Sequence, residues 1–324
     1  MPTVSVIIPN YNHAPFLRQR IETVLGQRYQ DFEVILLDDC STDDSRAIIS
    51  EYANDPRIRI EFNDKNSGST FKQWNKGVRL ARGKYVWIAE SDDYADERFL
   101  NESLSRLEND STTVFSYCRS WRVSGEGEIV GFADSFEIDR CNLRWAADFW
   151  ADGRDECERY FVHRNIVPSA SSVLFRRDVY DKIGGADERL VFCGDWKMWA
   201  SMALLGGRIA YLAQPLNYFR FHVTTVTAKS EQLGVDADEY LQVISWILQK
   251  TKLTTAAREA LCRDLFPFWY PKVLTNRITL ARRWRILKNA KLIDHNAIGK
   301  LLPHARTALR MTLSRRLRFI RFRF

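Results

Sequence analysis

Hydrophobic residues in the N-terminal third of the chain follow two patterns in turn. Short apolar runs, typical of strands buried in a parallel sheet, are separated by segments in which apolar residues recur every three or four positions, as on one face of a helix. The apolar runs lie at 3–9, 32–37, 57–62 and 85–89, and the helical spacing lies at 16–25, 41–52 and 68–81. Strands that alternate with helices predict an α/β fold with a mostly parallel sheet and flanking helices.

The rest of the chain has different patterns. From 111 to 225 the pattern is less regular, and strand-like runs lie at 114–117, 172–175, 208–212 and 216–221, with a helix beginning near Gly194. Beyond this part only helical spacing remains, over 239–250, 255–265, 279–292 and 298–320. We therefore expect an α/β domain over residues 1–225 and a helical C-terminal region over residues 226–324.

Charge is distributed unevenly between the two ends of the chain. The formal net charge is +7, but residues 272–324 hold 15 of the 48 Lys and Arg residues and only one acid, Asp294. Residues 1–271 hold the other 33 basic residues and 40 acidic ones, which gives a net charge of −7. A basic tail on an acidic body predicts contact with an anionic surface, and the two candidates are anionic lipid and nucleic acid.

The end of this tail has the pattern of a basic amphipathic helix. Apolar residues from Leu302 to Ile320 recur at three- and four-residue intervals, and arginines occupy much of the remainder. Helices of this kind lie in the interface of anionic membranes. The alternative is that the apolar stripe packs on the acidic body. We expect no nucleic acid as a partner, because no motif of a nucleic-acid-binding fold accompanies the charge.

No feature of the sequence points to export. No apolar stretch approaches the ~20 residues that a membrane-spanning helix needs, and the N-terminus lacks the pattern of a secretory signal. The six cysteines include no C-x-x-C pair, which argues against a disulfide framework and a structural zinc site. We therefore expect a cytoplasmic protein, held at the inner face of the membrane by its tail.

Paired acids follow two of the apolar runs. Asp38 and Asp39 come directly after the second run, and Asp92 and Asp93 come shortly after the fourth. Ligands of parallel α/β sheets bind beyond the carboxyl ends of the strands, so both pairs lie where a ligand is expected. Neighbouring carboxylates repel each other, and a Mg²⁺ or Mn²⁺ ion would relieve that repulsion. Taken alone, the acids fit helix caps or solvated turns equally well.

Four motifs in a fixed order add to this picture: Val4–Asn12, Leu37–Asp43, Asn66–Gly68 and Ala81–Asp93. Together they resemble the family 2 glycosyltransferases, which have the Rossmann-like GT-A fold. The resemblance extends over about residues 3–225. It implies a metal-dependent, inverting transfer of a sugar from a nucleoside diphosphate sugar, with a UDP-sugar as the expected donor. The acceptor would be a hydroxyl of a glycan or of a polyprenyl-diphosphate-linked molecule, as in the synthesis of bacterial surface polysaccharides.

The resemblance implies a donor site at the first three motifs. Pro9 and Tyr11 would line the pocket of the nucleotide base, and Asp39 would accept a hydrogen bond from the base or the ribose. Gly68 would also belong to the donor site.

The fourth motif would hold the diphosphate and its metal ion. The resemblance implies that Asp93 binds Mg²⁺ or Mn²⁺ and that Asp92 contacts the donor. Glu90 opens the motif where the family has an aspartate. The sequence therefore leaves open which of the three acids meets the ribose and which meets the metal.

Two later segments also resemble the family. Asp195, in Phe192–Trp199, stands where the family has its catalytic base, because an inverting transfer needs a carboxylate within reach of the acceptor hydroxyl. The alternative is that Asp195 caps a helix. In Tyr218–His222, the resemblance implies that Arg220 lies against the diphosphate and that His222 completes the metal shell. The alternative for His222 is a packed residue of an aromatic strand.

Two other functions fit part of the sequence. A nucleotidyltransferase also combines an α/β fold with acidic metal ligands, but it usually carries a Gly-rich basic loop after the first strand, and Pro9–His13 is not such a loop. A non-catalytic nucleotide-sugar-binding protein would have the same fold without turnover. The presence of Asp39, Asp92, Asp93 and Asp195 argues against that alternative, and the sequence does not exclude it.

Overall fold

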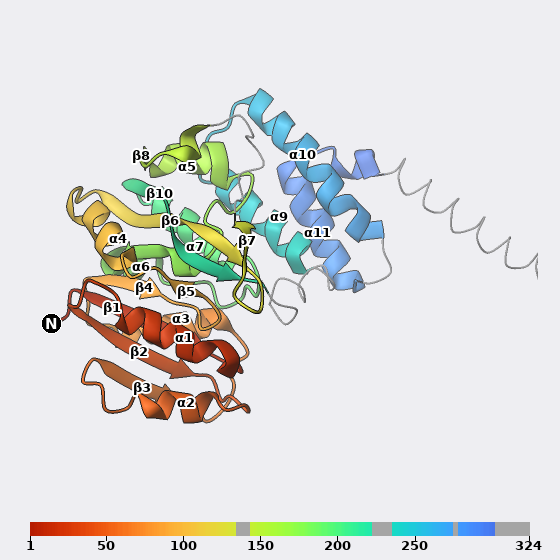
Figure 1. The fold of residues 1–324 in the computed structure, drawn as a ribbon. Helices are drawn as coiled ribbons and strands as arrows, with labels where there is room; N and C mark the ends of the chain where they lie inside the picture. Colours follow the sequence, from red (N-terminus) through yellow and green to blue (C-terminus); the bar gives the residue numbers. More distant parts are fainter. Residues whose placement is uncertain (134–142, 222–234, 275–277, 302–324) are drawn as a thin grey trace, which may run out of the picture. The chain divides into compact units, whose positions relative to one another are not determined.

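The computed structural model describes residues 1–133, 143–221, 235–274 and 278–301. The chain divides into two compact units, Met1–Thr225 and Val226–Phe324. The first is built around a ten-stranded sheet with flanking helices, and the described part of the second is helical (Figure 1). The predicted α/β class with a helical C-terminal region is therefore confirmed.

The sheet begins with parallel strands and continues as a mixed sheet. Its strands lie in the order β3-β2-β1-β4-β9-β6-β10-β5, with β7 beside β6 and β8 beside β10. The pairs among β1, β2, β3 and β4 are all parallel, whereas β9 is antiparallel to both of its neighbours. The strands are β1 (Val4–Asn10), β2 (Phe32–Asp38), β3 (Ile58–Phe62), β4 (Tyr85–Ile88), β5 (Tyr94–Ala95), β6 (Thr113–Val123), β7 (Ile129–Phe132), β8 (Phe149–Asp152), β9 (Val173–Arg176) and β10 (Arg208–Arg220).

One strand replaces two predicted ones. The runs 208–212 and 216–221 form the single strand β10, whose pairing with β6 shifts register on both sides of Pro215. Proline has no N–H to donate to a ladder and is accommodated in sheets at bulges. The polar interruption that separates the two runs in the sequence is therefore an irregularity within one strand.

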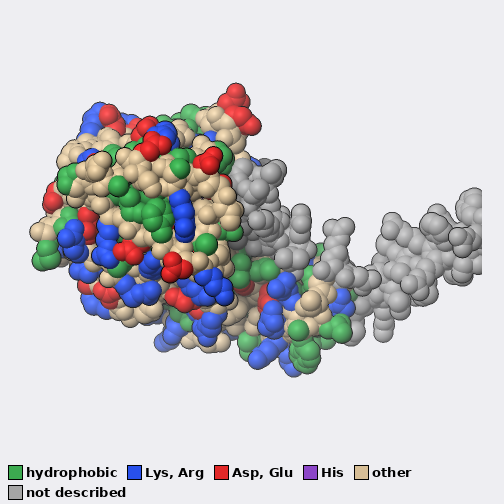
Figure 2. All heavy atoms as spheres, turned by 90° about the horizontal axis from the view of Figure 1, so that it is seen from below, with side chains coloured by type: hydrophobic (Ala, Val, Ile, Leu, Met, Phe, Trp, Pro, Cys, Tyr) green, Lys and Arg blue, Asp and Glu red, His purple; other side chains and the backbone are tan. Residues whose placement is uncertain are grey.

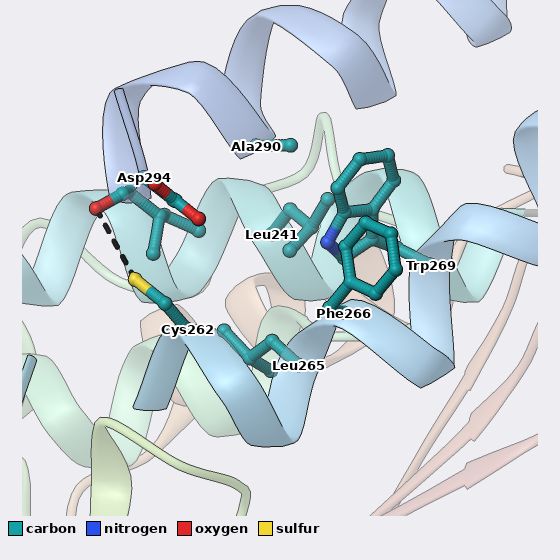
Figure 3. A pocket seen from close by; sticks show the side chains of 8 residues that line it. Leu241, Cys262, Leu265, Phe266, Trp269, Ala290 and Asp294 are labelled. Carbon is teal, nitrogen blue, oxygen red and sulfur yellow. Dashed lines mark hydrogen bonds between the residues drawn. The ribbon is translucent and has the colours of Figure 1, made fainter. Parts of the chain in front are cut away.

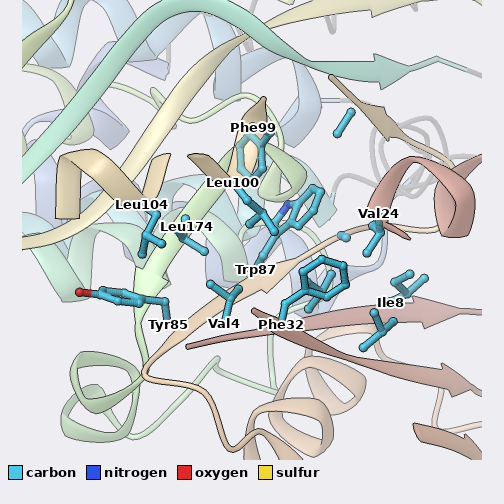
Figure 4. Close-up of a cluster of buried hydrophobic side chains, with 14 of the residues drawn as sticks. Val4, Ile8, Val24, Phe32, Tyr85, Trp87, Phe99, Leu100, Leu104 and Leu174 are labelled. Atoms are coloured by element: carbon cyan, nitrogen blue, oxygen red, sulfur yellow. The ribbon is translucent and has the colours of Figure 1, made fainter. Parts of the chain in front are cut away.

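Helices cover both faces of the sheet. On one face, α1 and α4 enclose a hydrophobic cluster with β1, β2 and β4, in which Val4, Phe32, Trp87 and Leu100 are at least 96% buried (Figure 4). On the other face α3 lies against β1 so closely that a Cβ on Gly77 would come within 2.4 Å of Ile7. The helices of this unit are α1 (Ala14–Leu25), α2 (Ser45–Glu51), α3 (Thr70–Leu80), α4 (Phe99–Glu108), α5 (Gly153–Glu156), α6 (Arg177–Ile183) and α7 (Gly194–Leu204).

The C-terminal unit includes α9 (Val235–Leu248), α10 (Thr255–Leu274) and α11 (Leu280–Ile293), and a further helical segment begins at residue 297. α10 is longer than the sequence pattern predicts, because it continues through Pro267 and Pro271. In the described ranges no helix is both long enough and apolar enough to cross a bilayer. Both His222 and the predicted amphipathic helix beyond Leu302 lie outside the described residues.

Candidate active site

The predicted site begins where β1, β2 and β4 end. These strands are parallel neighbours, so the residues that follow them meet at one edge of the sheet. Asn12 after β1 and Cys40 after β2 have φ values of +57° and +63°. Such left-handed conformations are uncommon in residues other than glycine and cluster at ligand-binding sites. The backbone is therefore unusual at the edge where the sequence predicts the donor.

The two acids after β2 have different environments. Asp38 is fully buried and accepts hydrogen bonds from Asn10 (3.0 Å) and from the guanidinium of Arg46 (2.9 Å), so it ties β2 to its neighbours. Asp39, which is 4% exposed, holds the loop before α3 instead. Its carboxylate accepts hydrogen bonds from Asn63 (2.6 Å), from the backbone N–H of Ser67 (2.9 Å) and its hydroxyl (2.7 Å), and from Gln73 (2.9 Å).

The acids after β4, Glu90, Asp92 and Asp93, form a cluster in which Asp93 is the most deeply buried. Burial, and next the negative charge of Asp92, raises the pKa of Glu90 to about 8. The same two causes, in the same order, raise the pKa of Asp93 to about 6. Asp93 is 2% exposed, whereas Asp92 is partly exposed. Carboxylates in such surroundings favour a cation beside them, so this cluster fits the predicted divalent ion.

A cation that the sequence analysis missed already lies in this cluster. Arg20 of α1 is wholly buried, and its Nε donates a hydrogen bond to the backbone oxygen of Glu90 (2.8 Å). Its two Nη atoms have no hydrogen-bond partner among the described residues. Burial lowers its pKa to about 10, against the opposing effect of Asp93, Asp92 and Glu90. In the sequence, Arg20 lies within the apolar stripe of α1, between Leu17 and Val24, and this position could have indicated that it is buried.

Asp93 joins three segments of the chain. Its Oδ2 accepts a hydrogen bond from the hydroxyl of Ser169 (2.9 Å), and its Oδ1 accepts one from the backbone N–H of Arg220 (2.9 Å). The fourth motif is thereby attached to the turn before β9 and to the end of β10.

Arg220 is 3% exposed, and its side chain contacts protein groups on several sides. The guanidinium donates to the backbone oxygens of Asp92 (2.8 Å) and Gly125 (2.9 Å) and to the side chain of Gln19 (2.7 Å). The predicted contact with a diphosphate is not tested by this arrangement. The arrangement does show that Arg220 connects α1, the acid turn and the β6–β7 turn.

One helix contacts predicted motifs on both the donor side and the acceptor side. Along α3, Gln73 donates to Asp39, and the indole N–H of Trp74 donates to Glu90 (2.6 Å). Asn75 donates to the backbone oxygen of Ala186 (3.0 Å) in the turn before α7. Phe71 packs on Gly194, where a Cβ would come within 2.4 Å of the ring. The sequence predicted α3 as a helix and gave no indication of these contacts.

Asp195 lies in the first turn of α7 and is not its cap, since Cys193 occupies the N-cap position. The capping alternative therefore does not hold. Asp195 is partly exposed, and its Oδ2 accepts a hydrogen bond from Asn165 (2.8 Å). The contact of Gly194 with Phe71 fixes the start of α7 against α3. It thereby helps to set the position of Asp195, the next residue in the helix.

The remaining predicted residues lie along the same edge. Pro9 is buried in β1, and Tyr11, directly after this strand, is 45% exposed. Gly68 has a φ of +69°, which favours glycine at that position of the loop held by Asp39. His13, to which the sequence analysis gave no role, hydrogen-bonds through Nδ1 to the hydroxyl of Ser91 (2.8 Å). The structure thus brings the ends of β1 and β4 together through His13.

Comparison with known proteins identifies a family. The family model described as glycosyl transferase family 2 matches residues 5–184. TuaG from Bacillus subtilis, described as a putative teichuronic acid biosynthesis glycosyltransferase, is 40% identical over 93 residues, which are 28% of this chain and 36% of TuaG. The chain spans between 13% and 37% of the length of the curated relatives that it matches.

Solved structures share the fold. Staphylococcus aureus TarS 1-349 in complex with UDP-GlcNAc has a TM-score of 0.71 and 18% identity, with coverage of 94% of this chain and 90% of that one. The mannosyltransferase PcManGT from Pyrobaculum calidifontis, in complex with GDP-Man and Mn²⁺, has a TM-score of 0.55 and 16% identity, with coverage of 95% and 81%. These likenesses support the predicted fold.

Proposed function

Because the chain belongs to glycosyl transferase family 2, we propose that it transfers a sugar, with inversion, from a nucleoside diphosphate sugar to an acceptor hydroxyl. The observation that carries the proposal is the set of contacts along α3, which connect Asp39 and Glu90 with the start of α7 beside Asp195. The description of TuaG supports an acceptor in surface-polysaccharide synthesis, either a glycan or a polyprenyl-diphosphate-linked molecule.

The donor in this proposal is a UDP-sugar, bound at the ends of β1 and β2. The TarS complex with UDP-GlcNAc supports that choice. The exposed ring of Tyr11 offers a surface for the base, beside Pro9, and the left-handed Gly68 lets the backbone approach the nucleotide. The oxygens of Asp39 already accept several hydrogen bonds, so its predicted bond to the base or ribose would replace one of them.

We assign a Mg²⁺ or Mn²⁺ ion to the turn of Asp92 and Asp93. The described residues contain no group of three or more His, Cys, Asp or Glu side chains that could hold a metal ion. The ion would therefore be shared with the donor diphosphate, as Mg²⁺ commonly is. Each carboxylate oxygen of Asp93 already accepts one hydrogen bond and keeps a further lone pair for the ion, whereas Asp92 is partly exposed. Asp93 therefore stays the predicted ligand, with His222 as the predicted second one and Asp92 as a further candidate.

When bound, the ion supplies positive charge that stabilises the departing diphosphate. The Asp195 carboxylate takes the proton from the acceptor hydroxyl, whose oxygen forms the new bond to the anomeric carbon. The bond from that carbon to the diphosphate breaks on the opposite face, which inverts the configuration. Asn165 orients the carboxylate through its hydrogen bond to Oδ2. Arg220 contributes in this proposal by holding the turn of Asp92, with a direct diphosphate contact as its predicted second role.

We further propose that the enzyme works at the cytoplasmic face of the membrane, where a polyprenyl-linked acceptor would be found. The basic tail supports this, because residues 272–324 carry 15 cations and one acid. Several arginines together can hold a protein on anionic lipid.

Calorimetric titration with UDP, GDP, dTDP and CMP, each with and without Mn²⁺, tests the donor site. We expect binding of UDP that Mn²⁺ strengthens, with Asp93→Asn losing most of the effect of the metal. Asp155→Asn, an exposed acid of α5, is the control and should behave as wild type. If no nucleotide binds under any condition, the proposal fails. Release of diphosphate instead of a nucleoside diphosphate during turnover would indicate a nucleotidyltransferase.

A further inference from the structure

α11 exposes an unusual mixture of side chains on one face. Leu280, Trp284 and Leu292 are 78%, 70% and 47% exposed, and Lys288 and Lys291 are exposed between them. At 3.6 residues per turn these five positions, which we name the α11 stripe, fall on one side of the helix. In Figure 2 the C-terminal unit, at the lower right, likewise shows basic side chains among hydrophobic ones.

The opposite face of α11 fixes the direction of the stripe. Ile286, Ala290 and Ile293 are at least 97% buried. Figure 3 shows Ala290 beside a small cavity whose other lining residues come from α9, α10 and the end of α11: Leu241, Cys262, Leu265, Phe266, Trp269, Ile293 and Asp294. The Cys262 thiol donates a hydrogen bond to the backbone oxygen of Ile293 (3.7 Å). Since the helix is packed on one side, exposure of the stripe follows from its register.

Ion pairs hold the same register. Arg285 forms an ion pair with Asp238 of α9 (2.7 Å), and the side chain of Arg282 approaches the same carboxylate (3.8 Å). At the start of the helix, the hydroxyl of Thr279 accepts a hydrogen bond from the backbone N–H of Arg282 (3.3 Å). Rotation of α11 that would bury Trp284 would therefore break the ion pairs with Asp238.

α11 has no acidic residue. Its 14 residues include five cations, which are Arg282, Arg283, Arg285, Lys288 and Lys291. Elsewhere in the described chain many exposed cations lie beside acids, as Lys182 does beside Asp178 in α6 (2.7 Å). A surface with exposed tryptophan and leucine, surrounded by lysine and arginine, is complementary to a partner that has an anionic surface layer over an apolar interior.

We propose that the α11 stripe is a membrane-binding surface, with Trp284 inserted at the level of the headgroups of an anionic bilayer. Tryptophan favours the membrane interface, and the lysines can extend along it while their ammonium groups meet lipid phosphates. A second copy of this chain is a poor occupant, because two stripes would bring cations together. Nucleic acid would match the charge and would leave Leu280 and Leu292 without an apolar partner.

The proposal rests on the membrane binding proposed for the basic tail, residues 272–324, and assigns it to one helix inside that tail. It concerns a helix within the described residues, and it holds whether or not residues 302–324 bind lipid. It also requires nothing of the donor site, so a failure of nucleotide binding would leave it standing.

Sedimentation of the full-length protein with vesicles tests the proposal. The vesicles contain either phosphatidylcholine alone or phosphatidylcholine mixed with phosphatidylglycerol. We expect binding to the mixed vesicles that Lys288→Glu with Lys291→Glu weakens by more than tenfold, since each cation near an anionic surface contributes about fivefold. Lys182→Glu, a reversal of an exposed lysine on α6, is the matched control and should bind as wild type.

A second measurement reports on insertion. With brominated lipids in the mixed vesicles, wild type should lose tryptophan fluorescence, and Trp284→Phe should lose much less while still sedimenting. Unchanged melting temperature and UDP binding would show that each variant is folded. Binding by the Lys288 and Lys291 double variant at the wild-type level, or equal quenching in Trp284→Phe, would overturn the proposal. The proposal would also be overturned if the protein sedimented with a polyanion such as RNA but with neither kind of vesicle.

Discussion

Three acids on the proposed donor side of the sheet, residues 1–110, are held differently from Asp195 on the proposed acceptor side, residues 143–221. On the donor side Asp38, Asp39 and Asp93 are at least 96% buried and accept several hydrogen bonds each. On the acceptor side Asp195 remains partly exposed, beside Asn165. These three buried acids therefore shape the edge of the sheet, whereas Asp195 has the exposure that its proposed role as general base requires.

The largest expected effect follows from that difference. Asp195→Asn keeps the shape of the side chain and the contact with Asn165 but cannot take a proton. We expect kcat for transfer to fall by about 10² to 10⁴-fold, the usual contribution of a general base, with UDP affinity unchanged. Asp178→Asn, an exposed acid on α6, is the control. Transfer at the wild-type rate in Asp195→Asn would remove Asp195 as the base.

Arg220→Met tests whether the donor side is held together from the far end of β10. The variant leaves the backbone oxygens of Asp92 and Gly125 without their donor. We expect a loss of about 3 kcal/mol in the free energy of unfolding, by urea titration, together with weaker UDP binding.

Arg176→Met is the matched control, because Arg176 also donates to backbone oxygens, those of Thr113 (2.7 Å) and Leu107 (2.6 Å). It pairs with Tyr85 at the start of β4, away from the carboxyl ends of the strands. We expect it to lose stability and keep UDP affinity.

Arg220→Lys separates the two roles of Arg220, which are holding the turn of Asp92 and contacting the diphosphate. A loss confined to UDP, with uridine affinity unchanged, would favour direct diphosphate contact over the holding of the turn.

A smaller effect is expected where the two sides meet. Gly194→Ala would place a methyl group within 2.4 Å of the Phe71 ring. Overpacking of this kind costs about 1–3 kcal/mol in unfolding free energy, and the start of α7 should move away from α3. We expect kcat to fall more than UDP affinity, because Asp195 moves and Asp39 does not. Gly125→Ala, which has nothing within 4 Å of the new methyl group, is the control. Equal losses in kcat and affinity would argue against the α3 connection.

The sequence predicted the donor half of the fold well for a physical reason. Parallel strands buried on both faces are continuous apolar runs, so β1, β2 and β4 were evident, and residues that follow such strands must meet at one edge. On the acceptor side the strands are mixed in direction, and short elements such as β8 and α5 carry no periodic pattern of their own. Their pairing depends on distant residues, as with Arg208–Tyr211 of β10 and Phe149–Asp152 of β8.

For the site, the sequence predicted a set of residues, and the structure adds the network of contacts among them. Asp39, Asp92 and Asp195 could be assigned to the predicted site because each lies in a recognisable motif. Arg20 was missed because a single arginine in an amphipathic helix usually lies at the surface. The contacts of α3 were missed because spacing predicts a helix and the face it buries, and cannot state which distant polar groups its side chains will meet.

The smallest expected effect concerns an exposed donor-side residue. Unlike the buried acids, Tyr11 is 45% exposed directly after β1, so its removal should cost little stability. If its ring covers the nucleotide base, Tyr11→Ala should weaken UDP binding by about fivefold, the value of roughly 1 kcal/mol of aromatic contact, with an unchanged melting temperature. Tyr11→Phe keeps the ring and should bind UDP as wild type does. Equal UDP affinity of wild type and both variants, measured by calorimetry, would show that the base binds elsewhere along this edge of the sheet. The nucleotide would then be bound without the exposed ring of Tyr11.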